Sequence, residues 1–105
     1  MRAHREQEFD SAMLDIYHRA ATECNYQPTR FLQMVIENGG LATAKRLLNS
    51  PRPAKGLTTL WELGRLDLSM EALVCRPKWR ALFAAGEIAE AQNRLVQLDY
   101  EIHEE

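Results

Sequence analysis

The side chains capable of acid–base chemistry are few and far apart. The histidines are His4, His18 and His103, and His18 has an acid at helical spacing, Asp15, three residues before it. Residues i and i+3 share one face of a helix, so this pair is either an acid–base couple or part of a solvated face, and we favour the solvated face. The sequence contains no Gly-rich phosphate loop, nucleophile elbow or HExxH motif. We therefore predict that the protein is not an enzyme and has no catalytic residue, cofactor or metal site.

Arg65 and Asp67 form a second group with recognisable chemistry. A guanidinium fork matches a carboxylate or phosphate with two hydrogen bonds, so Arg65 oriented by Asp67 or Glu71 would clamp an anion. The alternative is a salt bridge that fixes the connector after Gly64, and exposed pairs of this kind contribute about 0–1 kcal/mol. We favour the connector salt bridge.

Positive charge is concentrated in the middle of the chain. Residues 1–44 carry four cations and six anions, residues 45–80 carry eight cations and three anions, and residues 81–105 carry Arg94 against six anions. The basic segment would contact phosphates, with Trp79 stacking on an unpaired base. The alternative, which we favour, is that the acidic C-terminal helix neutralises this segment and that Trp79 is buried. The eight cations are Lys45, Arg46, Arg52, Lys55, Arg65, Arg76, Lys78 and Arg80.

Length and composition set the limits for these interpretations. With 105 residues, 46% hydrophobic and 27% charged, we expect a single globular domain over residues 1–105 with frayed ends at 1–4 and 103–105. No run of about 18 apolar residues exists to span a membrane, and the polar N-terminus does not have the pattern of a secretion signal. Cys24 and Cys75 lack CxxC spacing, so we expect two buried, reduced thiols in a cytoplasmic protein.

The elements that must position these residues are predicted to be helices. Apolar residues at spacings of three and four predict long helices over residues 5–24 and 87–102. A helix over residues 30–38, capped by Thr29, is apolar nearly all round and is expected in the middle of the core, and residues 41–49 form a shorter one. Gly39-Gly40 permits a reversal between these two helices, and the Pro-rich segment 50–56 is predicted to be a loop. We therefore predict an all-α bundle of about six or seven helices of unequal length, with the long first and last helices around short central ones.

The stretch 56–79 contains the densest helix signals. Thr58 or Thr59 is expected to cap a short helix that buries its Leu and Trp side chains and ends at Gly64 in the left-handed conformation. Ser69 or Asp67 then caps the next helix, and Pro77 opens another at its first turn. Helices this short are unstable alone, so they must pack against the longer ones.

The predicted last helix has a heptad-like apolar seam. Two heptads are short for a coiled coil, and in a chain of this size such a seam packs on its own core more often than on a second copy. We favour the core, and a homodimer through residues 88–102 is the alternative. The seam residues are Ile88, Ala91, Leu95, Leu98 and Ile102.

A longer pattern is carried by Phe31-Leu32-Gln33-Met34, Gly39-Gly40-Leu41, Ala44-Lys45-Arg46-Leu47-Leu48, Gly56-Leu57, Leu60-Trp61-Glu62, Gly64-Arg65-Leu66-Asp67-Leu68, Glu71-Ala72-Leu73-Val74, Trp79 and Leu82-Phe83. This pattern resembles a group of short, uncharacterised bacterial proteins over roughly residues 26–95. The resemblance implies no established activity and no site, but it suggests a defence or counter-defence context. The chain departs from the group at Ala84, where Ser or Thr is frequent and would be a better helix cap.

These observations lead us to predict a non-enzymatic module that binds a macromolecule. A protein partner is the leading hypothesis, because Arg and Trp, both present in the basic middle, are enriched at interface hot spots. The alternative is a nucleic acid held by the basic residues, whose binding would weaken steeply with salt. A small-molecule role would require a pocket lined by Arg65 and a histidine.

Overall fold

The computed structural model describes residues 4–53 and 55–102, and that part of the chain contains helices and no strand. The predicted all-α bundle is confirmed. The expected fraying at 1–3 and 103–105, together with His103, lies outside the described residues, while His4 is the first residue of the first helix. The elements are α1 (His4–Cys24), α2 (Thr29–Asn38), α3 (Gly40–Leu48), α4 (Lys55–Glu62), the 3-10 helix η1 (Leu66–Leu68), α5 (Met70–Val74), the 3-10 helix η2 (Pro77–Leu82) and α6 (Ala85–Gln97).

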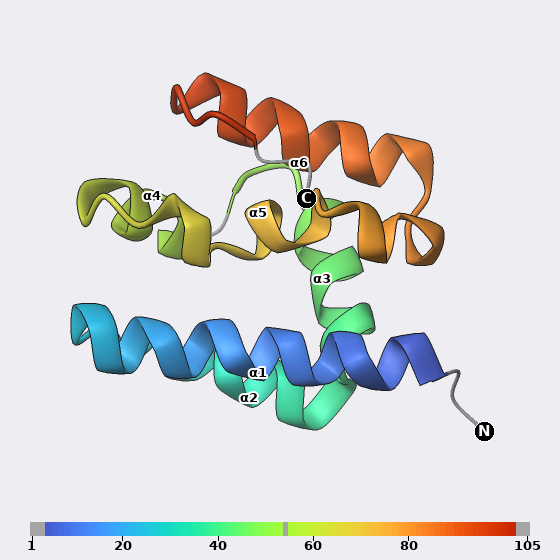
Figure 1. Cartoon of the computed structure of the whole chain (residues 1–105), viewed down its shortest axis with the longest axis horizontal. Helices are drawn as coiled ribbons and strands as arrows, with labels where there is room; N and C mark the ends of the chain where they lie inside the picture. The colour runs from blue at the N-terminus through green and yellow to red at the C-terminus, as the bar shows by residue number, and fades with distance from the viewer. Residues whose placement is uncertain (1–3, 54, 103–105) are drawn as a thin grey trace.

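The two longest helices, α1 and α6, lie on opposite sides of short central helices, as the hydrophobic periodicity predicted. Figure 1 shows α1 and α2 on one side of the molecule and α6 on the other, with α3 crossing between them. Helices α4 and α5 lie in the middle layer, and α5 packs against both α1 and α6. No helix of the described residues is long and apolar enough to cross a membrane.

The apolar side chains form two separate clusters. The large cluster is centred on Phe9, whose ring meets the rings of Trp79 and Phe83 edge-on, with centroid distances of 5.3 and 5.4 Å. The small cluster lies under α4 and joins that helix to η1 and to the second half of α1. The large cluster comprises Phe9, Met13, Ile16, Val35, Ala44, Leu48, Met70, Leu73, Val74, Cys75, Trp79, Phe83, Ala91 and Leu95. The small one comprises Ala20, Leu57, Leu60, Leu66 and Leu68.

Several predicted helix boundaries are confirmed. Gly64 follows α4 with φ +71°, the left-handed conformation that glycine adopts without a steric penalty. The Ser69 hydroxyl accepts a hydrogen bond from Ala72 N at 3.1 Å and so caps α5. Pro77 opens η2 at its first turn. Gly39, with φ +86°, makes the reversal between α2 and α3.

The predicted last helix was too long at its C-terminal end. Helix α6 ends at Gln97, because Asp99 takes a left-handed conformation with φ +60° and Tyr100 N donates to Leu95 O at 3.0 Å. The chain thereby reverses and packs Tyr100 and Ile102 against the large cluster. At the other end, Ala84 is the N-cap without a side-chain cap, and Glu87 Oε1 accepts from Ala84 N at 2.9 Å.

Helix α2 is peripheral, which corrects its expected place in the middle of the core. It packs against α1 and α3 on the outer side of the molecule. Val35 is its buried residue, and Ile36 is 68% exposed. Apolar residues all round α2 therefore do not mean that the helix is enclosed by the core, because its faces are only partly covered. Thr29 is its first residue rather than its cap, and the N-cap position is Pro28.

The segment around α4 also differs from the prediction. The helix begins at Lys55, so the Pro-rich loop is shorter than 50–56, and neither Thr58 nor Thr59 is its cap. Trp61 and Leu63, expected to be buried, are 49% and 45% exposed. Cys24 and Cys75 form no disulfide; Cys75 is buried as expected, but Cys24 is half-buried.

Candidate binding groove

The eight predicted cations are not gathered on one surface. Lys78 Nζ lies 3.2 Å from Glu8 Oε2, and Arg65 Nη2 lies 2.7 Å from Glu23 Oε1. Those two acids are fifteen residues apart on α1, about 22 Å along the helix axis. The acids of α1 therefore neutralise part of the basic segment, a contribution that we did not predict.

The expected neutralisation by α6 involves Lys45. Its ammonium lies 2.8 Å from Glu87 Oε1 and 5.3 Å from the centre of the Phe83 ring. Burial raises the pKa of Glu87, but hydrogen bonds from Lys45, Ala84 N and Asn49 act the other way and leave it lowered. Trp79 is 4% exposed and is not available to stack on a base, which confirms the expected burial.

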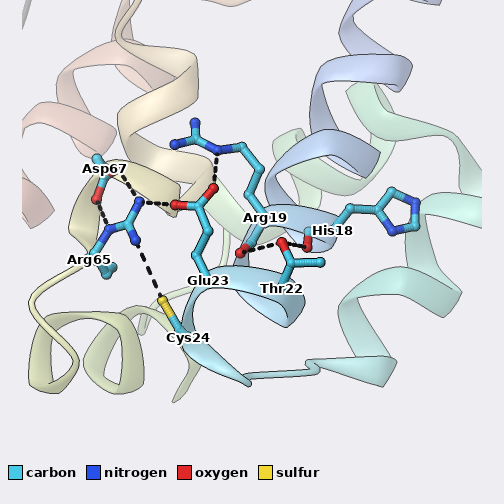
Figure 2. Close-up of polar contacts among 7 residues, drawn as sticks. All are labelled: His18, Arg19, Thr22, Glu23, Cys24, Arg65 and Asp67. Carbon is cyan, nitrogen blue, oxygen red and sulfur yellow. Dashed lines mark hydrogen bonds and ion pairs between the residues drawn. The ribbon is translucent and has the colours of Figure 1, made fainter.

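Arg65 is held by groups of its own chain (Figure 2). Its Nε and Nη2 donate to the two carboxylate oxygens of Asp67 at 3.0 and 3.1 Å. Nη2 also reaches Glu23, which accepts from Arg19 Nε at 2.9 Å, and Nη1 lies 3.9 Å from Cys24 Sγ. Hydrogen bonds to Asp67 and Glu23 raise the pKa of Arg65. Because the guanidinium fork is occupied, the contacts favour the connector salt bridge over an anion clamp.

The predicted apolar seam faces the interior of its own chain. Ala91 and Leu95 are 0% exposed and belong to the large cluster, and Ile88 packs against it. Leu98 and Ile102 lie beyond the end of α6, so they do not extend a helical seam. These contacts confirm the favoured interpretation that the seam packs on its own core.

A groove of about 750 Å³ opens where the large and the small cluster meet. It is lined by residues of α1, α2, the end of α3, α4, η1 and α5, and its floor takes side chains from both clusters. Most of its apolar lining residues are buried members of the two clusters, whereas Phe31, Met34 and Leu47 are half-buried. The apolar lining residues are Ile16, Ala20, Phe31, Met34, Leu47, Leu57, Leu60, Leu68 and Met70.

The edge of this groove is positively charged. Arg30, Arg46 and Lys55 line it, and among the described residues none of the three has an acidic partner. The first residues of α2 and α4 also line it, so the positive ends of two helix dipoles lie at the same edge. The one acid among the described lining residues is Glu71, whose Oε2 accepts from Arg94 Nη1 at 3.2 Å. The groove is therefore apolar at its floor and cationic at its edge.

Sequence reasoning found part of this site. Arg46 and Lys55 belong to the predicted basic segment, whereas Arg30 lies outside it and has no distinguishing signal in the sequence. Arg52 and Arg76 are exposed and do not line the groove, and Arg80 is likewise exposed away from it. Neither Arg65 nor a histidine is among the described lining residues, so the condition that we set for a small-molecule site is not met.

A second hollow of about 680 Å³ lies between α1 and the turn from α2 to α3. Its described lining includes Glu6, Asp10 and Glu37, with Lys45 and the exposed Ile36. Its charge is thus opposite to that of the groove, which makes it a useful internal control. Nowhere in residues 4–53 and 55–102 do three or more His, Cys, Asp or Glu side chains gather in a metal-binding cluster.

Comparisons with known protein families, curated proteins and solved structures find no match to this chain. The resemblance to short bacterial proteins therefore stays a prediction.

Proposed function

We propose that the protein is an interaction module that binds a segment of a partner protein in the groove between α1, α2 and α4. The observation that carries this proposal is the apolar floor at the junction of the two clusters. Phe31, Met34 and Leu47 are half-buried there, so a partner side chain would complete their burial.

The same observations favour a protein over a nucleic acid. A surface for single-stranded nucleic acid combines a basic track with aromatic faces for the bases, but Trp79 is buried. Lys45, Arg65 and Lys78 are engaged with acids of the chain, which reduces the charge available for phosphates. The remaining cations lie beside an apolar floor, and apolar surface is what a protein segment buries.

We place this binding in the cytoplasm. The support is that neither Cys24 nor Cys75 forms a disulfide, as is usual in reducing compartments.

A peptide selection with two matched variants tests the proposal. The probe is a phage-displayed library of random peptides of about 16 residues, roughly four helical turns in length. The selected peptides are then titrated against the wild type, Met34→Gln and Ile36→Gln. Met34 and Ile36 lie two residues apart on α2, but Met34 lines the groove while Ile36 lines the second hollow.

We expect groove-bound peptides to lose about tenfold in affinity with Met34→Gln, because burying a Met side chain contributes about 1.5–3 kcal/mol. Ile36→Gln should leave the affinity within about twofold. As a control, circular dichroism and the thermal midpoint should show that both variants fold like the wild type. Selected peptides that are insensitive to Met34→Gln would contradict the proposal. Oligonucleotide binding that collapses with salt would replace it with the nucleic-acid alternative.

A further inference from the structure

We infer that the segment bound in the groove is an acidic amphipathic helix. This inference rests on the proposed function and adds the conformation and the charge of the partner. Three observations carry it: the helical sides of the groove, its apolar floor, and the cations at its edge.

The conformation follows from the backbone of the groove. The lining residues belong to helices and to the connections between them, and the described part of the chain contains no strand. The groove therefore has no strand edge with which an extended peptide could pair. An extended segment would leave its own backbone groups unpaired against the apolar floor, at a cost comparable to lost hydrogen bonds. A helix satisfies those groups internally and presents apolar side chains at spacings of three and four.

The charge follows from how the cations of the chain are distributed. Lys45, Arg65, Lys78 and Arg94 each have an acidic partner within the protein. Arg30, Arg46 and Lys55 have none among the described residues, and all three line the groove. The one acid of the lining is occupied by Arg94, so it does not offset them. Carboxylates on the polar side of a bound helix would supply the missing partners.

Four peptide libraries separate conformation from charge. Three share a helical pattern of randomised apolar residues and differ in the polar positions, which are acidic, neutral or basic. The fourth is the acidic library with a central proline, which breaks a helix. Binders are titrated against the wild type, Arg46→Glu, Arg30→Glu and the control Arg76→Glu. Arg76 is an exposed cation without an acidic partner among the described residues, and it does not line the groove.

We expect the acidic helical library to supply the tightest binders. Reversing Arg46 or Arg30 should weaken them about tenfold, because attraction becomes repulsion, while Arg76→Glu should change affinity less than about twofold. The tightest binders should also lose affinity with Met34→Gln and keep it with Ile36→Gln.

Each other result has a defined meaning. If neutral or proline-containing peptides bind as tightly and remain sensitive to Met34→Gln, the acidic helix is wrong and the protein-binding groove stands. If Arg76→Glu weakens binding as much as Arg46→Glu, long-range charge rather than the groove edge explains the preference, and the inference also falls. If no library supplies a binder sensitive to Met34→Gln, both the inference and the proposed function are overturned.

Discussion

Arg94 and Glu71 form an ion pair in the interior, with Arg94 Nη1 3.2 Å from Glu71 Oε2 and both side chains at most 5% exposed. Arg94 also donates to Glu90 Oε2 at 2.7 Å and to the carbonyls of Leu48 and Ser50 at 3.4 and 3.1 Å. One side chain of α6 thereby fixes α5 and the end of α3. Because Glu71 and Ser50 also line the groove, this pair supports the wall that carries Arg46.

Replacing Arg94 with Met should destabilise the protein strongly. Removing one member of a buried pair leaves the other charge uncompensated, which costs about 3–5 kcal/mol. Urea unfolding of Arg94→Met measures this loss. The double variant Arg94→Met with Glu71→Leu should recover part of it, since no buried charge remains. Additive losses from the two single variants would show that the pairing itself has little effect.

The pH dependence of stability gives a second test of the same pair. Burial raises the pKa of Glu71 above its ordinary value of 4.5, although its backbone amide and Arg94 act in the opposite direction. Above 4.5 the folded state therefore holds this proton more tightly than the unfolded state. The contribution of Glu71 to the free energy of unfolding therefore falls as the pH rises from 4.5 through the raised pKa of the folded state.

Comparison with Glu71→Gln isolates this contribution, because the glutamine does not titrate. Urea unfolding of both proteins from about pH 4 to about pH 7 should show the wild type losing stability relative to the variant as pH rises. A wild type that gains relative stability over this range would show that Arg94 outweighs burial, so the pKa is lowered instead.

Truncating the two tryptophans should destabilise the protein to very different extents. Trp79 packs edge-on against Phe9 in the large cluster, and Trp79→Ala should cost about 3–5 kcal/mol of unfolding free energy. Trp61 is 49% exposed, and Trp61→Ala should cost less than about 1 kcal/mol. Chemical denaturation followed by circular dichroism measures both losses without relying on tryptophan fluorescence. Equal losses would contradict the placement of Trp61 at the surface.

The local signals in the sequence predicted most helices but not all of their ends. Gly64, Ser69 and Pro77 act through their own backbone or side-chain chemistry, so their roles could be predicted without the fold. Asp99 ends α6 in a left-handed conformation that is uncommon for a residue other than glycine. No glycine or proline near this position indicates that the helix ends there. The exposed side of α2 could not be predicted either, because apolar residues all round a helix do not tell which face is covered.

The candidate site was less predictable, because the fold assembles it from distant segments. Arg30 joins Arg46 and Lys55 only because α2, α3 and α4 border one groove. The ion pair of Arg65 with Glu23 joins residues 42 positions apart. Net charge along the sequence therefore identified a basic segment but could not tell which cations have partners and which remain at the groove.

Substitutions of two glycines should separate steric crowding from backbone conformation. A Cβ on Gly40 would lie 2.9 Å from Asp10 Oδ1, 3.0 Å from Asp10 Cα and 3.1 Å from Met13 Cγ, so α1 and α3 would have to separate. At Gly64 a Cβ meets nothing within 4 Å, and the cost arises from φ +71° alone. Overpacking costs about 1–3 kcal/mol and increases with side-chain size. The left-handed conformation costs about 1–2 kcal/mol and is tolerated best by Asn.

The order of Ala and Asn should therefore be reversed between the two sites. Gly64→Asn should be less destabilising than Gly64→Ala, whereas Gly40→Asn should be more destabilising than Gly40→Ala. Urea midpoints of the four variants measure this order. If Asn is the better tolerated residue at both positions, the close packing of α3 on α1 at Gly40 is wrong. The same close packing includes the hydrogen bond from Gly40 N to Asp10 Oδ1 at 2.6 Å, which fixes the start of α3 against α1. That result would therefore also contradict this hydrogen bond.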